Sequence, residues 1–202
     1  MRDAVNRPAT ADLDDVEAGR AQEYALFAVL LADPPTGDLL ARLAVLPGDA
    51  SPLGFAHAAL ARAAATTDAA RAKREFFKLF VGVGRGELLP YGSYYLTDML
   101  HDRPLARLRS DLARLGIAKT EGCAEPEDHA ALLCDIMAGL IDGRFAAPPG
   151  ADRQIFATHL APWMGRFFAE LQTARSADFY RSVGALGSAF MAIESEAFTL
   201  AA

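Results

Sequence analysis

The sequence predicts a single all-α domain, and three observations carry this prediction. Ala and Leu are the commonest residue types, whereas Val, Ile and Thr are sparse, a balance that favours helices over strands. No stretch alternates polar and apolar residues with a period of two. Hydrophobic residues make up 52% of the 202 residues, enough for a sizeable core. We expect one bundle of about eight to ten helices over residues 13–202, preceded by a flexible tail over residues 1–12.

Helix breakers and capping residues divide the first half of the chain. A first helix is expected to end at Ala32, because Pro34 disfavours helical geometry in the residue before it. Ser51 followed by Pro52 is a typical N-cap and first helical position, and Asp68 is a second N-cap candidate. The expected helices are 14–32, 37–45, an Ala-rich helix from 52, and one that runs from 68 to 80.

The segment 81–92 is rich in glycine and is expected to be an ordered loop. Gly82, Gly84 and Gly86 occupy alternate positions, and their backbone N–H groups could surround a phosphate. A P-loop would end in Gly-Lys-Ser/Thr, whereas Glu87 follows here, and the residues before the loop predict a helix rather than a strand. Turn conformations with positive φ explain the glycines more simply.

The second half of the chain is expected to hold four or more further helices. Ser93 is expected to cap a short helix through residue 100, and Pro104 to open a helix that Gly116 closes. Residues 125–129 are expected to open the next helix. After a connector at 147–150, Pro162 should kink or split the following helix. The last three helices show apolar side chains at helical spacing, namely Leu133, Ile136, Met137, Leu140 and Ile141; Phe156, Leu160, Trp163, Phe167 and Leu171; and Phe179, Val183, Leu186, Phe190 and Ile193.

Charge and cysteine content indicate the compartment. A formal net charge of -6 is the opposite of what a general nucleic-acid binder shows, so no nucleic-acid partner is expected. Two cysteines are too few for a disulfide framework, which indicates a reducing compartment. No export signal and no apolar run of the length that spans a bilayer is visible, so we expect a cytoplasmic protein without stable membrane insertion.

No residue pattern predicts catalysis or metal binding. Asp128 beside His129 could form a general base, but adjacent helical residues point about 100° apart. The four histidines lack the i, i+4 spacing of a helical zinc site, and Cys123 and Cys134 have no partner pair. We expect no catalytic residue, no metal and no cofactor.

The acidic residues before the next helix leave two interpretations open. Glu121, Glu125, Glu127 and Asp128 would stabilise the positive end of a helix dipole. They would equally form an acidic patch that faces a basic peptide. Tyr91 lies in a loop, and an exposed aromatic there could form the floor of a groove for a peptide helix.

Two motifs, in this order, resemble those of the TorD/DmsD/NarJ family of redox-enzyme maturation chaperones. The first is the stretch 75–82, EFFKLFVG, followed by PYGSYY at 90–95, and the second is EPEDH at 125–129. The segment HLAPW at 159–163 is similar to a weaker family pattern, as are Arg20 and Tyr24 before Pro34. The resemblance covers about residues 20–198.

The resemblance implies an all-helical chaperone that binds the apo catalytic subunit of a molybdenum-cofactor oxidoreductase, often at its twin-arginine leader. Such a chaperone holds its client until cofactor is inserted, and release permits export or assembly. Leader arginines would meet Glu127 and Asp128 by bidentate pairing. The expected peptide-binding residues are Phe76, Leu79, Phe80, Pro90, Tyr91, Ser93, Glu125, Glu127, Asp128 and His129; among them, Ser93 and Glu125 are implied to hold the loop and helix together.

Two other functions stay open. One is a small nucleotide hydrolase that uses Gly82–Gly86 and Asp128, although Lys78 lies on the wrong side of the loop for a phosphate-binding lysine. The other is a structural accessory subunit of an oxidoreductase. Weak guanine-nucleotide binding has been attributed to some members of the family, and the glycines do not establish it here. A monomer and a homodimer formed by domain swapping are both open.

Overall fold

The structure is a computed structural model that describes residues 15–119 and 122–200, with side chains as far as residue 198. Within these residues the chain forms ten α-helices and two π-helical segments and no strand, which confirms the predicted all-α class. The elements are α1 (Asp15–Ala32), α2 (Gly37–Leu43), α3 (Pro52–Thr66), α4 (Ala69–Phe76), η1 (Phe77–Val81), α5 (Gly92–Thr97), α6 (Arg103–Arg114), α7 (Ala130–Ile141), α8 (Ala151–Ile155), η2 (Phe156–Leu160), α9 (Met164–Thr173) and α10 (Phe179–Leu200). The tail predicted at residues 1–12 lies outside the described residues.

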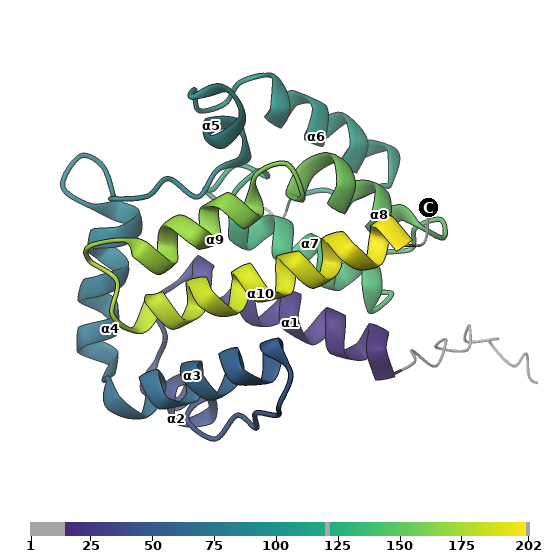
Figure 1. Cartoon of the computed structure of the whole chain (residues 1–202). Helices are drawn as coiled ribbons and strands as arrows, with labels where there is room; N and C mark the ends of the chain where they lie inside the picture. The colour runs from purple at the N-terminus through teal and green to yellow at the C-terminus, as the bar shows by residue number, and fades with distance from the viewer. Residues whose placement is uncertain (1–14, 120–121, 201–202) are drawn as a thin grey trace, which may run out of the picture.

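Four helices form the centre of the bundle. Helix α1 packs mainly on α7, and α10 packs on α9 and α3. Figure 1 shows α2 and α3 below this centre, α5 and α6 above it, and α4 at one edge. The helices that carry or adjoin the first sequence motif therefore lie at the upper and outer parts of the bundle.

Aromatic side chains fill the space between the central helices. Phe27 of α1 contacts Phe168 of α9, with ring centroids 4.9 Å apart. Tyr24 of α1 meets Phe190 of α10 edge to face, also at 4.9 Å. Such pairs bury large apolar areas and have preferred geometries, so they fix the angle between helices as well as stabilising them.

A buried ionic network fixes α1 to α10 and α8. The Arg20 guanidinium donates to both Glu194 carboxylate oxygens at 2.8 Å and reaches Asp152 at 3.3 Å. The Tyr24 hydroxyl donates to the same Glu194 carboxylate at 2.9 Å. Burial alone would lower the pKa of Arg20, but Glu194 and its neighbouring carboxylates raise that pKa above its ordinary value. Removing one partner would leave a buried charge uncompensated.

The first motif begins with a glutamate that caps another helix. The Glu75 carboxylate accepts hydrogen bonds from the backbone N–H groups of Asp178 at 2.8 Å, Phe179 at 3.1 Å and Tyr180 at 2.7 Å. These donors are at the start of α10, where N–H groups have no partner within the helix. Glu75 therefore joins α4 to α10.

The local capping predictions are confirmed at Ser51 and Asp68. The Ser51 hydroxyl accepts from the Gly54 N–H at 3.0 Å, and the Asp68 carboxylate accepts from the Arg71 N–H at 2.8 Å. Pro162 lies between η2 and α9, so the predicted split is also confirmed.

Two boundary predictions are wrong. Helix α5 begins at Gly92, so Ser93 lies inside it, and the Ser93 hydroxyl instead accepts from the His101 N–H at 3.2 Å. Helix α7 begins at Ala130, so residues 125–129 precede this helix and do not form its first turn. Both starts are held by bonds between the two motifs, which a search for local caps does not detect.

Each π-helical segment continues an α-helix by one wider turn. The Gly82 N–H bonds to the Phe77 carbonyl at 2.6 Å, and the Ala161 N–H bonds to the Phe156 carbonyl at 2.9 Å, both with the i to i−5 spacing of a π-turn. Segment η1 belongs to the first motif, and η2 includes the start of the weaker pattern at 159–163. Such turns are frequent at functional sites.

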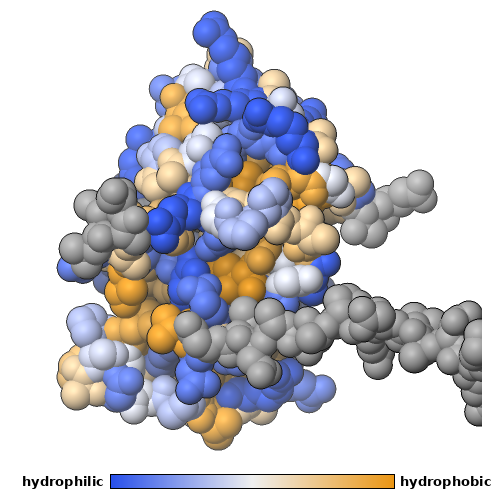
Figure 2. Space-filling view, turned by 90° about the vertical axis from the view of Figure 1, so that its right-hand side faces the viewer, coloured by the Kyte–Doolittle hydropathy of each residue, from blue (hydrophilic) through white to orange (hydrophobic). Residues whose placement is uncertain are grey.

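The end of the molecule where α1 starts shows hydrophobic patches between hydrophilic side chains (Figure 2). A cavity of about 290 Å³ lies there between α1 and α10, lined in part by Val16, Leu53 and Ile193. Among the described residues, no helix has the length and hydropathy needed to cross a bilayer.

Close packing of α9 against α10 depends on glycine. A Cβ on Gly184 would lie 2.5 Å from the Gln172 backbone nitrogen, whereas a Cβ on Gly19 of α1 would meet nothing within 4 Å. We expect Gly184→Ala to lower the free energy of unfolding by roughly 2 kcal/mol or more, because backbone must shift. Gly19→Ala should raise it by about 0.5–1 kcal/mol, because alanine restricts the unfolded chain and favours helix. Urea unfolding measures both changes, and equal effects would contradict this account of the packing.

Candidate functional site

The two sequence motifs meet in space through their backbones. The Gly92 N–H donates to the Asp128 carbonyl at 2.9 Å, and the Ala130 N–H donates to the Pro90 carbonyl at 2.8 Å. These bonds flank an isolated antiparallel bridge between Tyr91 and His129. The segment before α5 and the segment before α7 therefore pair through backbone hydrogen bonds, as two neighbouring antiparallel strands do.

Side chains strengthen this joint. The Asp128 carboxylate Oδ2 accepts from the Ser93 N–H at 2.7 Å and so caps α5 from outside its own sequence. The His129 Nδ1 accepts from the Ala131 N–H at 3.1 Å and caps α7. The Tyr91 ring packs edge to face on the His129 ring, with centroids 5.1 Å apart. The Tyr91 hydroxyl donates to Glu125 at 2.7 Å.

Burial shifts the pKa of the His129 imidazole and of the Tyr91 hydroxyl. Loss of hydration lowers the pKa of His129 below its ordinary value, although Glu125 and Asp128 act in the opposite direction. The neutral imidazole is also the form in which Nδ1 accepts the Ala131 N–H. Burial and the hydrogen bond to Glu125 raise the pKa of Tyr91, so its hydroxyl stays a donor.

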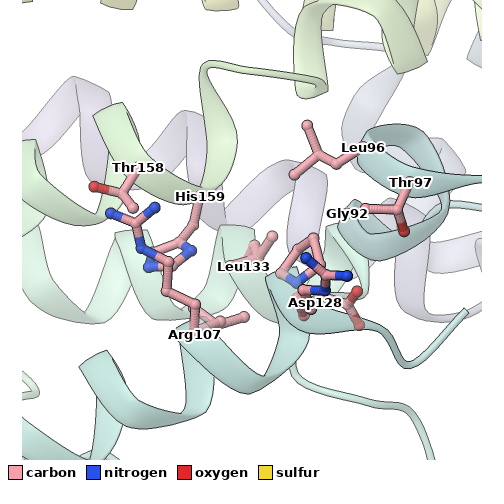
Figure 3. Close-up of a pocket in the computed structure, with 11 residues that line it drawn as sticks. Gly92, Leu96, Thr97, Arg107, Asp128, Leu133, Thr158 and His159 are labelled. Atoms are coloured by element: carbon pink, nitrogen blue, oxygen red, sulfur yellow. The ribbon is translucent and has the colours of Figure 1, made fainter. Parts of the chain in front are cut away.

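A cavity of about 320 Å³ opens beside the joint. It lies between α5, α6, α7 and η2, and Figure 3 shows Leu96, Arg107, Asp128, Leu133 and His159 around it. Its walls are mostly apolar. The Asp128 side chain is nearly buried, and its Oδ1 has no hydrogen-bond donor among the described residues. Because buried carboxylate oxygens almost always have donors, this oxygen is suited to a donor that a ligand brings.

The cavity also carries positive charge. Arg103 and Arg107 of α6 line it together with Asp128. His159 lines it from η2, and its Nε2 lies 2.7 Å from Asp111 Oδ2, which ties α6 to η2. The cavity is therefore mixed in charge, with one acidic side chain beside two arginines.

The acidic residues of the second motif do not form one patch. Glu127 pairs with Arg109 at 2.8 Å and lines a different cavity, of about 190 Å³, together with Cys123 and Asp135. Partial burial would raise the pKa of Glu127, but the bond from Arg109 lowers it overall. Glu125 is exposed, and Glu121 lies outside the described residues. Glu127 and Asp128 therefore line different cavities, and their pairing with leader arginines stays a prediction.

The hydrophobic residues of the first motif lie apart from this cavity. Leu79 is fully buried, while Phe80 contacts Tyr180 at 5.5 Å and Phe167 at 6.5 Å between ring centroids. Phe76 packs on Phe80 at 5.0 Å. Six of the ten predicted residues come together, namely Pro90, Tyr91, Ser93, Glu125, Asp128 and His129. Glu127 lines a different cavity. Leu79 belongs to the core, and the partly buried Phe76 and Phe80 pack against it. Their role in peptide binding stays a prediction.

Sequence reasoning missed most of the cavity. Leu96, Arg103 and Arg107 reach it because α5 and α6 fold back over α7 and η2, and nothing in their local sequence indicates this. Three large apolar residues, Leu96, Met99 and Leu100, occur within five positions of the sequence, and the structure leaves all three exposed.

The glycine loop has a structural explanation. Gly82 has a φ of 63°, and a Cβ there would lie 1.9 Å from the Arg85 carbonyl oxygen. Gly84 has a φ of 87°. These positions need glycine to form the turn, as the simpler interpretation predicts. In the described part of the chain, no group of three or more His, Cys, Asp or Glu residues could hold a metal ion.

Comparison with solved structures defines the class of fold. A protein from Archaeoglobus fulgidus that is assigned as a redox enzyme maturation protein superposes with a TM-score of 0.60. The match covers 86% of this chain and 93% of that one at 15% identity, so it shows a shared fold.

Residues 46–169 match the profile of the family described as nitrate reductase delta subunit, and the chain belongs to this family. The predicted family membership is thereby confirmed. The chaperone protein TorD of Vibrio atlanticus is 25% identical over 60% of this chain and 61% of that one. A Haemophilus influenzae protein assigned as the Tat proofreading chaperone DmsD is 29% identical over 54% of this chain and 52% of that one. The chain spans about three fifths of the length of the TorD relatives that it matches.

These relatives are named as chaperones, and the prediction of a non-enzymatic protein is confirmed at the level of the family.

The cap at His129 predicts a pH dependence of stability. The unfolded chain takes up a proton near pH 6.5, whereas the folded protein resists it, so stability falls as the pH drops below 6.5. His129→Asn keeps a side-chain oxygen for the Ala131 N–H but does not titrate. We expect wild type to lose up to about 1 kcal/mol relative to this variant between pH 7.5 and 5.5. Urea unfolding at both pH values measures this difference, and parallel pH profiles would contradict a buried neutral imidazole.

Proposed function

We propose that this protein is a cytoplasmic chaperone for the catalytic subunit of a molybdenum-cofactor oxidoreductase. It binds the apo subunit at its twin-arginine leader or N-terminus and holds it for cofactor insertion before export or assembly. Family membership and the names of the relatives support the chaperone role.

One observation carries the binding site: Asp128 lines the cavity beside the joined motifs, and its buried Oδ1 has no hydrogen-bond donor among the described residues. A guanidinium can supply the missing donor and form a charge-assisted hydrogen bond there. Arg103 and Arg107 line the same cavity, so it accommodates one client arginine and disfavours two. A second arginine would bind outside it, where Glu125 is exposed.

The apolar part of a leader has a surface next to this cavity. Leu96 lines the cavity, and Met99 and Leu100 follow it in sequence with large exposed areas. A leader helix could cover these side chains with its hydrophobic face. Burial of the apolar face would supply affinity, and the arginine would supply orientation.

A twin-arginine leader peptide should bind the full chain with a Kd in the micromolar range, a usual scale for a shallow groove. Asp128→Asn should weaken binding by about tenfold or more, because the amide can still accept the Ser93 N–H but loses its charge. Replacing both leader arginines by lysine should also weaken binding, since lysine cannot pair in a bidentate manner. Calorimetry measures these affinities, and circular dichroism checks that the variant stays helical.

Asp142→Asn is the matched control, because Asp142 is exposed at the other end of α7 and pairs with Arg144. It should leave leader binding unchanged. Absence of binding to any twin-arginine leader and to the apo catalytic subunit would contradict the proposal, as would equal effects of the two variants.

An accessory subunit is the second candidate, and the name of the family favours it. Pull-down from the native host separates the two roles. Co-purification with apoenzyme supports a chaperone, whereas stable co-purification with mature, cofactor-loaded enzyme supports a subunit.

A further inference from the structure

The outward face of α4 and η1 is strongly basic. Exposed residues recur along the whole stretch, and the charged ones among them are Arg71, Lys73, Arg74 and Lys78. Glu75 is the only acidic residue between 69 and 81, and it is buried against the start of α10. The face therefore carries four positive charges in a protein whose net charge is -6.

Large apolar side chains share this face. Phe77 is 45% exposed and Val81 51%, and Val83 in the following loop is 97% exposed. Figure 1 shows α4 and this loop at the edge of the molecule. The stretch combines exposed aromatic and aliphatic groups with lysine and arginine, a composition typical of helices that lie on membranes.

Neighbouring residues leave the charge largely intact. Asp68 at the start of α4 lies 3.6 Å from Arg71, and both are exposed, so this pair is weak. At the start of α10, which Glu75 holds against α4, the exposed Asp178 lies between Arg175 and Arg181 in sequence. The acidic neighbours Asp68, Asp178 and Glu87 are balanced by Arg175, Arg181 and Arg85, so the face keeps its own four positive charges.

The shape of the face selects the kind of partner. It is the outer side of a single helix at an edge, and no residue of α4 or η1 lines the cavity beside Asp128. A convex face of this kind offers no groove for a peptide, but it can lie on an extended anionic surface. We infer that α4, η1 and the tip of the glycine loop dock peripherally on membranes that contain anionic phospholipid.

In this arrangement the four basic side chains contact lipid headgroups, and Phe77, Val81 and Val83 enter the interface. Each basic residue near an anionic bilayer adds about fivefold to binding, and the attraction falls within a Debye length of roughly 8 Å at physiological salt. The docking uses surfaces distinct from the Asp128 cavity, so it does not depend on leader binding.

Co-sedimentation of the full chain with vesicles tests this inference. Vesicles of phosphatidylcholine with about one third phosphatidylglycerol should bind the protein at low salt, and pure phosphatidylcholine vesicles should not. Lys73→Gln with Lys78→Gln should weaken binding about 25-fold, from two losses of about fivefold each. Val83→Ser, at a side chain with almost no contacts to lose, should weaken binding severalfold.

Arg42→Gln with Arg62→Gln is the matched control, since it changes the net charge equally at exposed positions of α2 and α3. It should leave vesicle binding within about twofold of wild type. Leader binding should be unchanged in every one of these variants. No binding to the anionic vesicles, or equal losses for the two double variants, would overturn the inference. Tighter binding of a DNA duplex or of an acidic peptide to the same face would also overturn it, because another anion would then be the partner.

Discussion

The site depends on how one aspartate joins two distant segments. The Asp128 carbonyl accepts from Gly92, and its Oδ2 accepts from Ser93, so a single residue fixes the start of α5 relative to the start of α7. Its remaining oxygen, Oδ1, is buried without a donor among the described residues, and Asp128 lines the cavity. The same side chain is thus needed for the architecture and is available for recognition, which explains why the two roles are difficult to separate by removing it.

The parts of the fold that local chemistry determines could be predicted from the sequence. Ser51 and Asp68 cap their own helices, and Pro162 interrupts a helix because it lacks an N–H. The prediction that Ser93 caps its helix is wrong because Asp128, 35 positions away, caps this helix. For the site, the family motifs indicated that Tyr91 and His129 belong together. The arginines of α6 could not be predicted, because only tertiary packing brings them to the cavity.

The acidic segment shows why composition is a poor guide to a charged surface. Glu127 and Asp128 are adjacent and lie before the helix, in a segment that pairs with the other motif. Their side chains line different cavities, and both residues lie in a turn that the bond from the His129 N–H to the Pro126 carbonyl closes. The first motif behaves in the same way. Phe80 points into the core, whereas Phe77 and Lys78 face outward, so one short stretch serves both stability and surface chemistry.

The wide turn η1 constrains how the chain can change in length. A π-turn is equivalent to an α-helix with one inserted residue. Deleting one residue between 77 and 81 would restore the regular turn and rotate α4 by about 100° relative to the glycine loop. Glu75 would then lose its alignment with the start of α10, or Glu87 would lose the hydrogen bonds that its carboxylate accepts from the Arg175 and Ser176 N–H groups. Homologues that lack one residue in this segment should therefore also differ at the contacts of Glu75 and of Glu87, which lie on either side of the deletion.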